Sequence, residues 1–237
     1  MTFVPFLLGI VFIFIHLTAN YFIPAGRIQQ IKWFSFSGGL ATSYVFIYLL
    51  PTLHTEQQNI ETRFLNLAMD SEIYIIGLLG VVMLMAVQIS IHQNYVSDES
   101  SFWLTIGFYA VYNALVSFTI LSSEVYGLQA LFYGFAIGLH FLAVAHDMWR
   151  EFREPYERYG RYILAAGILV GWILALTTDL SALTKSIIFA FVSGAMIYNV
   201  FINEIPKEKD THFPSFLIAV VFYSMIAISL KLFFEWY

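Results

Sequence analysis

The chain has 237 residues, of which 59% are hydrophobic and only 11% are charged, and its formal net charge is −5. Soluble domains carry about 25% charged residues, so this composition excludes an ordinary water-soluble domain and indicates a surface that contacts lipid. The chain has no cysteine, which excludes disulfides and thiolate chemistry, and it has no basic run able to follow a nucleic-acid backbone.

Eight stretches without Asp, Glu, Lys or Arg are each long enough to cross a hydrocarbon core about 30 Å thick, which takes roughly 17–25 residues of helix. In chain order they cover residues 3–25, 33–53, 73–91, 102–123, 125–146, 162–178, 186–203 and 213–230. They do not alternate with polar residues as β-barrel strands do. We therefore expect an all-α integral membrane protein, a single transmembrane domain over residues 1–237 with the lipid bilayer as its partner.

The distribution of Lys and Arg predicts the orientation, because these residues favour cytoplasmic loops. The connections after the first, third, fifth and seventh helices hold eight of the 11: Arg27, Lys32, Arg150, Arg153, Arg158, Arg161, Lys207 and Lys209. The opposite side holds Arg63, Lys185 and Lys231. Both termini are therefore expected outside the cytoplasm.

Residues 35–51 and 190–206 are similar at a constant offset of 155. Six positions are identical: Phe36 and Phe191, Gly39 and Gly194, Val45 and Val200, Phe46 and Phe201, Ile47 and Ile202, and Pro51 and Pro206. Because the second predicted helix runs outward and the seventh runs inward, the repeat is inverted, a pattern typical of transporters. It predicts a 3+2+3 bundle with helices four and five at the centre.

Polar residues within these two central helices are the candidates for a transport path. His140 and Asn113 lie within predicted spans, where an ionisable residue is by default a functional candidate. A neutral imidazole or an amide can equally form a structural hydrogen bond between packed helices, and both interpretations stay open. Tyr112 and Tyr48 can close such a path through hydrogen bonds to His or Asn, or can simply pack.

Three further polar residues lie near the end of the seventh predicted helix. Asn199 and Asn203 are four residues apart and form a polar face that can look inward. Glu204 follows at the helix end, where we expect a solvated carboxylate or one that guides cations.

Glycines spaced for close helix contact recur in the fifth and sixth predicted helices, as Gly134 and Gly138 and as Gly167 and Gly171. Such GxxxG patterns favour tight packing within the bundle or at the face of a homodimer. The sequence has no nucleophile–base constellation, no P-loop and no HExxH motif, so we do not expect an enzyme.

Four segments resemble motifs of the ZIP (Zrt/Irt-like) family of divalent-metal transporters. FSGGLATSYVFIYLLPTL at 36–53 resembles that family's glycine-containing helix ending in His-Leu-Leu-Pro-Glu, and FVSGAMIYNVFINEIP at 191–206 resembles its Gly-x-x-x-Tyr helix. YNALVS at 112–117 and GLHFLAVAHD at 138–147 lie where the family has its two central ligand motifs. The resemblance implies eight helices, outside termini, an inverted repeat and transport of a divalent metal. The short loops of this chain suggest a bacterial inner membrane.

The positions that match the family's metal ligands have mostly lost them. Only Asn113 and His140 keep a ligand type, and the others are replaced by Tyr48, Thr52, Tyr112, Val116, Phe141 and Val144. Without carboxylates nothing offsets the dehydration of a divalent cation in an apolar site. We therefore expect no resident cofactor, with a divalent metal at Asn113 and His140 as the one exception left open.

Two functions follow from this degenerate site. In the first, the chain is a ZIP-like transporter that moves a solute or ion by a route other than the usual binuclear metal site. In the second, it is a pseudo-transporter, a membrane scaffold, sensor or partner subunit that moves nothing.

Overall fold

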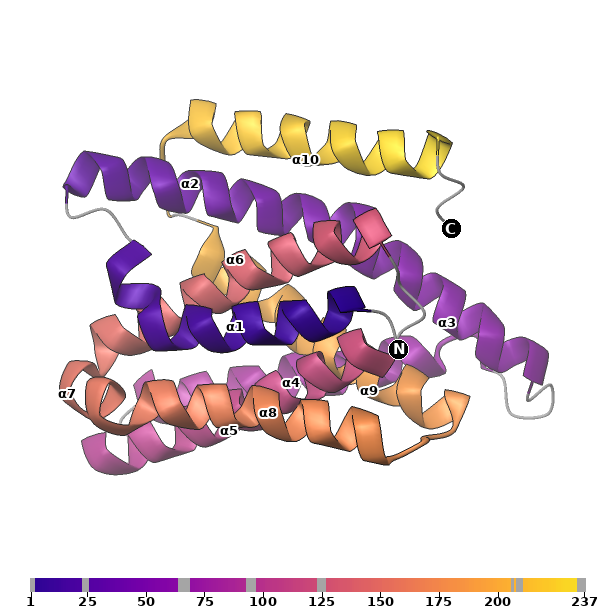
Figure 1. The fold of residues 1–237 in the computed structure, drawn as a ribbon, viewed down its shortest axis with the longest axis horizontal. Helices are drawn as coiled ribbons and strands as arrows, with labels where there is room; N and C mark the ends of the chain where they lie inside the picture. Colours follow the sequence, from indigo (N-terminus) through magenta and orange to yellow (C-terminus); the bar gives the residue numbers. More distant parts are fainter. Residues whose placement is uncertain are drawn as a thin grey trace.

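A computed structural model of the chain describes residues 3–22, 26–63, 69–92, 97–122, 127–205, 207 and 211–233. These residues form eight continuous helices and no strand, and the helices lie side by side in one bundle (Figure 1). In chain order they are α1 (Phe3–Phe22), α2–η1–α3 (Arg27–Tyr44, Val45–Leu49, Leu50–Arg63), α4 (Glu72–His92), α5 (Asp98–Ser122), α6 (Gly127–Glu151), α7–η2–α8 (Arg153–Pro155, Tyr156–Gly160, Arg161–Thr177), α9–η3 (Ala182–Asn199, Val200–Glu204) and α10 (Phe213–Phe233). The three η segments are π-helical turns inside or beside longer helices.

The all-α expectation is confirmed, but the number of membrane-length helices differs from the prediction. Seven helices in the described part of the chain are long and apolar enough to cross a bilayer. α1 is itself a helix of 20 residues, Phe3–Phe22, within which the stretch counted as an apolar helix is Phe6–Ala19. Residues 23–25, which completed the first predicted span, lie outside the described residues.

The second helix is longer than its predicted span of 33–53, because it continues as α3 to Arg63. The apolar run ends near Leu53, but the polar residues that follow remain helical and bond to the start of α4. Gln57 donates to the carboxylate of Glu72 at 2.7 Å and accepts the backbone N–H of Ile73 at 2.9 Å. The polar continuation is thereby held against its neighbour.

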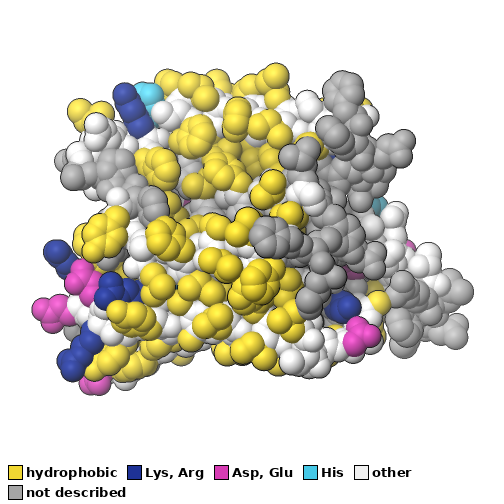
Figure 2. Space-filling view, in the orientation of Figure 1, with side chains coloured by type: hydrophobic (Ala, Val, Ile, Leu, Met, Phe, Trp, Pro, Cys, Tyr) yellow, Lys and Arg dark blue, Asp and Glu magenta, His cyan; other side chains and the backbone are white. Residues whose placement is uncertain are grey.

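Large apolar side chains cover the outside of the bundle. On α10, for example, Ile218 is 62% exposed and Met225 is 64% exposed. Figure 2 shows hydrophobic side chains across the middle of one face, with charged side chains gathered toward its two ends. A surface of this kind is compatible with a membrane protein, because lipid covers such an apolar band and water meets the charged ends.

The helices pack in a definite set of pairs. The closest partners are α5 with α8, α4 with α9, and α2 with α10, while α1 contacts both α6 and α8. The span in α6 is 72% buried and that in α10 only 17%, so α6 lies at the centre and α10 at the periphery (Figure 1). This arrangement places the polar residues of α6 deep inside the bundle.

Close helix contacts depend on residues without side chains at several of these pairs. A Cβ on Gly194 of α9 would overlap the carbonyl oxygen of Gly77 on α4, and one on Gly171 of α8 would overlap that of Ala114 on α5. By contrast, a Cβ on Gly107 would meet nothing within 4 Å. The glycines predicted to favour tight packing therefore lie at contacts within the bundle.

We predict that Gly194→Ala destabilises the protein by about 2–3 kcal/mol, because a methyl group cannot enter the contact unless α4 and α9 separate. Thermal unfolding of the purified protein in detergent measures the effect. Gly107→Ala is the matched control, and it should leave the unfolding temperature unchanged or slightly higher. Equal behaviour of the two variants would contradict the packing described for α4 and α9.

Candidate functional site

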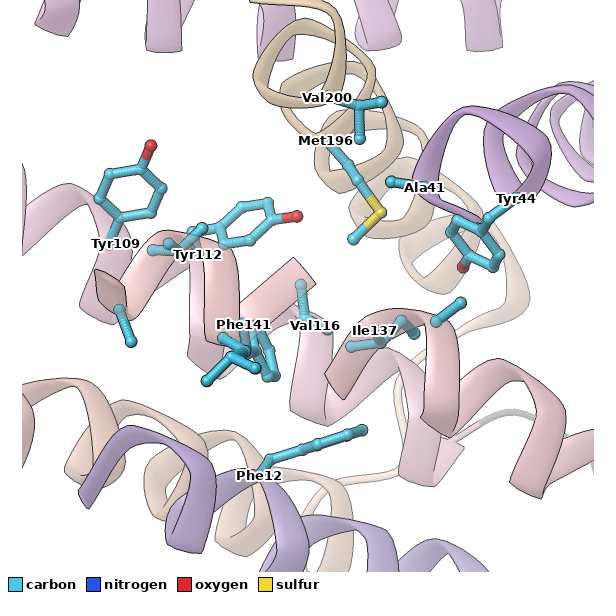
Figure 3. Close-up of a cluster of buried hydrophobic side chains, with 14 of the residues drawn as sticks. Phe12, Ala41, Tyr44, Tyr109, Tyr112, Val116, Ile137, Phe141, Met196 and Val200 are labelled. Atoms are coloured by element: carbon cyan, nitrogen blue, oxygen red, sulfur yellow. The ribbon is translucent and has the colours of Figure 1, made fainter. Parts of the chain in front are cut away.

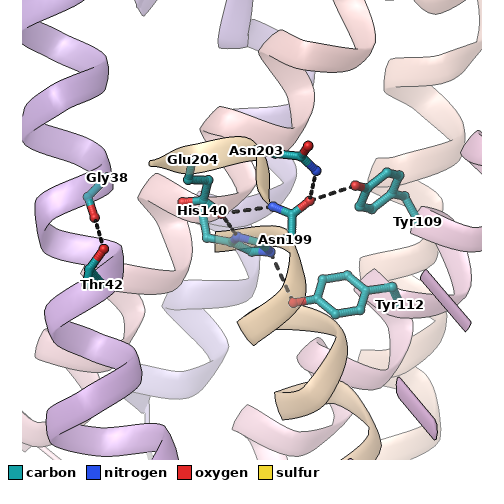
Figure 4. A network of polar contacts seen from close by, with 8 residues as sticks. All are labelled: Gly38, Thr42, Tyr109, Tyr112, His140, Asn199, Asn203 and Glu204. Carbon is teal, nitrogen blue, oxygen red and sulfur yellow. Dashed lines mark hydrogen bonds and ion pairs between the residues drawn. The ribbon is translucent and has the colours of Figure 1, made fainter. Parts of the chain in front are cut away.

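A connected group of polar side chains lies at the centre of the bundle, where α5, α6 and α9–η3 meet (Figure 4). We call it the His140 network, and its members are Tyr109, Tyr112, His140, Asn199, Asn203 and Glu204. His140 is 2% exposed, Asn199 3% and Glu204 6%. These three groups are therefore shielded from solvent and depend on partners within the network, whereas Asn203 is exposed at its edge.

His140 is the hub of this network. Its Nδ1 contacts the carboxylate of Glu204, and its Nε2 lies 3.0 Å from the hydroxyl of Tyr112. With Nδ1 protonated, the imidazole donates to Glu204 and Nε2 accepts from the phenol; this tautomer is assigned from the partners. If the imidazole gains its second proton, at Nε2, the same phenol oxygen can accept a hydrogen bond from that N–H. The geometry therefore accommodates both neutral and protonated His140.

Asn199 holds the carboxylate from its other side. Its Nδ2 donates to Glu204 at 2.9 Å, and its Oδ1 accepts from Tyr109 at 2.9 Å and from Asn203 at 2.8 Å. The second carboxylate oxygen of Glu204, Oε2, has no hydrogen-bond partner among the described residues. One acceptor site at the centre of the bundle thus remains open.

The π-helical turn η3 brings Asn199 and Glu204 together. Residues five apart in an α-helix point about 140° away from each other. In η3 the backbone N–H of Ile205 bonds to the carbonyl of Val200 at 3.0 Å, five residues back. This wider turn places residues five apart nearly above one another. The side chain of Glu204 consequently points into the bundle, although it stands at the end of its helix.

A second polar pair lies on the other side of Phe141. Asn113 of α5 is 2.9 Å from Nε2 of His16 on α1, and its amide also reaches the carbonyl of Leu164 at 3.4 Å. The ring centroids of His16 and Phe141 are 5.1 Å apart, and those of His140 and Phe141 are 6.0 Å apart. The phenyl ring therefore separates this pair from the His140 network.

The four predicted site residues are thus divided among three places. Tyr112 and His140 are bonded to each other, as one of the two interpretations of Tyr112 anticipated. Asn113 belongs to the pair with His16, and Tyr48 lies in a cavity described below. Of the two interpretations of Glu204, the solvated carboxylate at a helix end is wrong, because η3 turns the side chain inward, and a role in guiding cations stays a prediction. The only sequence signal for Glu204 was the neighbouring polar face of Asn199 and Asn203.

A cavity of about 610 Å³ enters the bundle between the end of α2–η1–α3, the end of α5 and the start of α6 and α9. Exposed residues such as Thr55 and Asn59 stand at its mouth, and Tyr48 lies on its wall. Its floor is formed by buried side chains, namely Tyr44, Val116, Ile137 and Met196, which converge in Figure 3. This floor is largely apolar.

The floor of the cavity lies about one helical turn from the His140 network on three separate helices. Val116 follows Tyr112 by four residues on α5, Ile137 precedes His140 by three on α6, and Met196 precedes Asn199 by three on α9. At 1.5 Å of rise per residue, three or four residues correspond to about 5–6 Å. A single layer of side chains therefore separates the cavity from the buried His140 and Glu204.

The network offers few ligands for a metal ion. Within the described ranges, no group of three or more His, Cys, Asp or Glu side chains is placed to hold one. Asn113 and His140, the two retained ligand types, bond to different partners and do not converge. The arrangement is better suited to holding and passing a proton than to coordinating a divalent cation.

Comparison with known proteins overturns the resemblance drawn from the sequence. A family model described as a protein of unknown function, DUF3270, matches residues 83–149, from the second half of α4 into the last turn of α6, and no model of the ZIP family matches. No curated protein and no solved structure matches the chain. The ZIP resemblance was therefore wrong. It was carried by short apolar motifs with a glycine or proline, which recur in unrelated membrane helices.

We predict that His140→Leu lowers the stability by about 3–5 kcal/mol, because it leaves the carboxylate of Glu204 buried without its partner. The double variant His140→Leu with Glu204→Leu should regain at least half of that loss, since both buried polar partners are then removed. Denaturation of the purified protein in detergent measures His140→Leu, Glu204→Leu and the double variant.

Replacing Asp179, which pairs with Lys185 at 3.6 Å and is fully exposed, should change nothing measurable and provides the control. If the two single substitutions added to give the effect of the double one, the two side chains would not be coupled.

Proposed function

We propose that this protein is an integral membrane transporter that moves a small solute together with a proton, and that His140 and Glu204 carry the proton. The observation that supports this most directly is the cavity that ends one helical turn from the buried network. Ionisable side chains inside a membrane bundle commonly mark ion pathways and proton relays. A solute site and a proton site separated by one layer of side chains can be coupled by a small movement of that layer.

The membrane location is supported by the seven apolar helices and by the apolar outer surface. The distribution of Lys and Arg further favours an orientation with both termini outside the cytoplasm. In that orientation the cavity opens to the outside, because its mouth lies at the same end of the bundle as the start of α1 and the end of α10 (Figure 1). The network then lies on the cytoplasmic side of the cavity floor.

An inverted 3+2+3 repeat is supported by the pairing of the helices. In such a repeat, α1, α2 and α4 correspond to α8, α9 and α10, and α5 corresponds to α6. Under this correspondence, the contact of α2 with α10 is equivalent to the contact of α9 with α4. The contact of α1 with α6 is likewise equivalent to that of α8 with α5. The π-turns agree with it as well, since η1 begins at Val45 and η3 at Val200, the offset of the sequence repeat.

The two halves of this repeat differ where the chemistry would occur. At the offset of 155, Asn199 corresponds to Tyr44 and Glu204 corresponds to Leu49. One π-turn therefore carries the polar network, whereas the other contributes to the wall and floor of the cavity. We propose that the repeats have specialised, one for the proton and one for the solute.

Transport in such an architecture proceeds by alternating access, in which one repeat moves against the other around a central site. The present conformation is open on the cavity side and closed beyond the network. In the opposite conformation the floor would close over the solute, and a path would open past His140 toward the other end of α6. A proton at Nε2 of His140 would make the ring an imidazolium, strengthen its contact with the carboxylate of Glu204 and so bias the two conformations.

The alternative, a scaffold, sensor or partner subunit that moves nothing, is favoured by one observation. The cavity floor is closed by large, buried side chains, and the hydroxyl of Tyr112 already occupies Nε2 of His140. If these contacts never open, the cavity is a static recess. The two functions differ in whether residues beyond the network ever become accessible.

The accessibility of introduced cysteines from the two sides of the membrane tests the transporter function. Because the sequence has no native cysteine, a thiol reagent reacts only with the introduced one. We predict that Ser193→Cys in the cavity reacts with a membrane-impermeant thiol reagent from the outside only. Val144→Cys, which is 2% exposed and one turn beyond His140, should react from the cytoplasmic side only. Ile168→Cys, buried in the core, is the unreactive control. Modification at Ser193→Cys without any at Val144→Cys would support the scaffold instead.

Labelling at exposed helix ends tests the orientation independently. We predict that Glu154→Cys at the start of α7–η2–α8 reacts only from the cytoplasm, and that Thr55→Cys on α3 reacts only from outside. Both side chains are exposed, so failure to react cannot be ascribed to burial. Intact cells and inverted membrane vesicles, treated with the same impermeant reagent, give the two readouts. The reverse pattern would place the cavity on the cytoplasmic side.

A further inference from the structure

The cavity has the size and lining of a site for a small organic molecule. Ligand sites commonly measure about 300–1,000 Å³ and combine apolar walls with a few placed polar groups, and this cavity measures about 610 Å³. Apolar residues form its floor, and a small number of charged and hydroxyl side chains stand on its walls. The identity of those charged groups indicates which class of molecule it suits.

Three charged residues line the cavity, and two of them are already engaged. Lys185 pairs with Asp179 at 3.6 Å. Glu56 accepts a hydrogen bond from Ser186, a neighbour on the cavity wall. The Ser186 hydroxyl is neutral, so Glu56 keeps its negative charge, whereas the ammonium group of Lys185 already faces a carboxylate.

Lys231 is the third, and it has no carboxylate partner among the described residues. Its Nζ donates to the carbonyl oxygen of Ile47 in η1 at 3.2 Å, which holds the partly buried ammonium group against the cavity wall. An ammonium group has three N–H donors, so donors remain for another acceptor. Lys231 is consequently the cation on the cavity wall that has N–H donors left for an anionic ligand.

Aromatic rings line the same cavity. The ring centroids of Tyr48 and Tyr133 are 3.7 Å apart, and those of Tyr44 and Tyr48 are 5.2 Å apart. Such rings offer flat apolar surfaces on which another ring can pack. Deeper in the cavity, the hydroxyl of Ser193 is buried and has no hydrogen-bond partner among the described residues.

We propose that the cavity binds a small organic carboxylate with an aromatic or similarly flat apolar body. The carboxylate accepts hydrogen bonds from Lys231, and the body packs against the tyrosine rings. The proposal rests on the proposed function only for the movement of this ligand, because binding itself needs no transport. A carboxylate moved together with one proton carries no net charge, which matches a proton site directly beyond the cavity floor.

Binding of three probes with the same ring tests the proposal. Benzoate, benzamide and benzylamine differ in charge but little in shape, and each is titrated by calorimetry into the full-length protein purified in detergent. We expect benzoate to bind at least tenfold more tightly than either of the others. Benzylamine binding as tightly as benzoate, or no binding of benzoate, would overturn the proposal.

Variants assign the binding to the ammonium group. Lys231→Met should weaken benzoate binding at least tenfold, whereas Lys231→Arg should retain most of it, which separates loss of charge from loss of fold. Lys32→Met is the matched control. Lys32 lies near the start of α2 and does not line the cavity, so this variant should bind benzoate as the native protein does. Unchanged benzoate affinity in Lys231→Met would refute the assignment.

The same measurement separates the two proposals. His140→Gln lies outside the cavity lining and should leave benzoate binding intact. Binding with no reactivity of Val144→Cys from the cytoplasm would retain the carboxylate site and reject transport. Reactivity at both cysteines without benzoate binding would retain transport and reject the carboxylate.

Discussion

The contact between His140 and Glu204 is the interaction on which the centre of this bundle depends. A carboxylate removed from water costs several kcal/mol even after relaxation, and the cost is recovered only if every hydrogen-bonding position is well placed. Glu204 obtains its partners from α6 and from Asn199, while Tyr109 and Tyr112 bring in α5. Three helices must therefore meet at one level. Around this centre, small residues such as Gly194, at the contact of α9 with α4, let neighbouring helices approach closely.

Much of the fold could be predicted from the sequence, because long apolar runs without a charged residue predict helices of membrane-crossing length. Uninterrupted apolar runs are expensive in water and required in lipid, so the helices from α4 to α10 lie close to their predicted limits. The extension of α2 through α3 was not predictable in this way. It depends on hydrogen bonds of Gln57 to Glu72 and Ile73, which are tertiary contacts with no local signal.

The site was predicted less completely, for a physical reason that differs between residues. His140 and Tyr112 are polar positions inside long apolar runs, and such positions stand out. Glu204 does not, because a carboxylate followed closely by Pro206 and Lys207 has the composition of any solvated helix end. Its true environment is set by the π-turn, which depends on packing and leaves no pattern in the residues. The family resemblance failed on similar grounds, since short glycine and proline motifs are common to many membrane helices.

The π-turn at the end of α9 also has a consequence for how this chain tolerates insertions and deletions. A π-turn accommodates one residue more than the α-helical turn it replaces, so η3 behaves as a one-residue insertion that the helix has absorbed. Residues before and after it cannot be placed on one helical wheel. If η3 relaxed to an α-helical turn without losing a residue, the carboxylate would rotate by about 100° and turn away from His140. Loss of a single residue between Val200 and Glu204 would instead leave the carboxylate four residues after Asn199, on the same face of a regular α-helix. In related chains, an alignment gap of one position here would therefore be compatible with a carboxylate that still points inside, held by an α-helical turn in place of the π-turn.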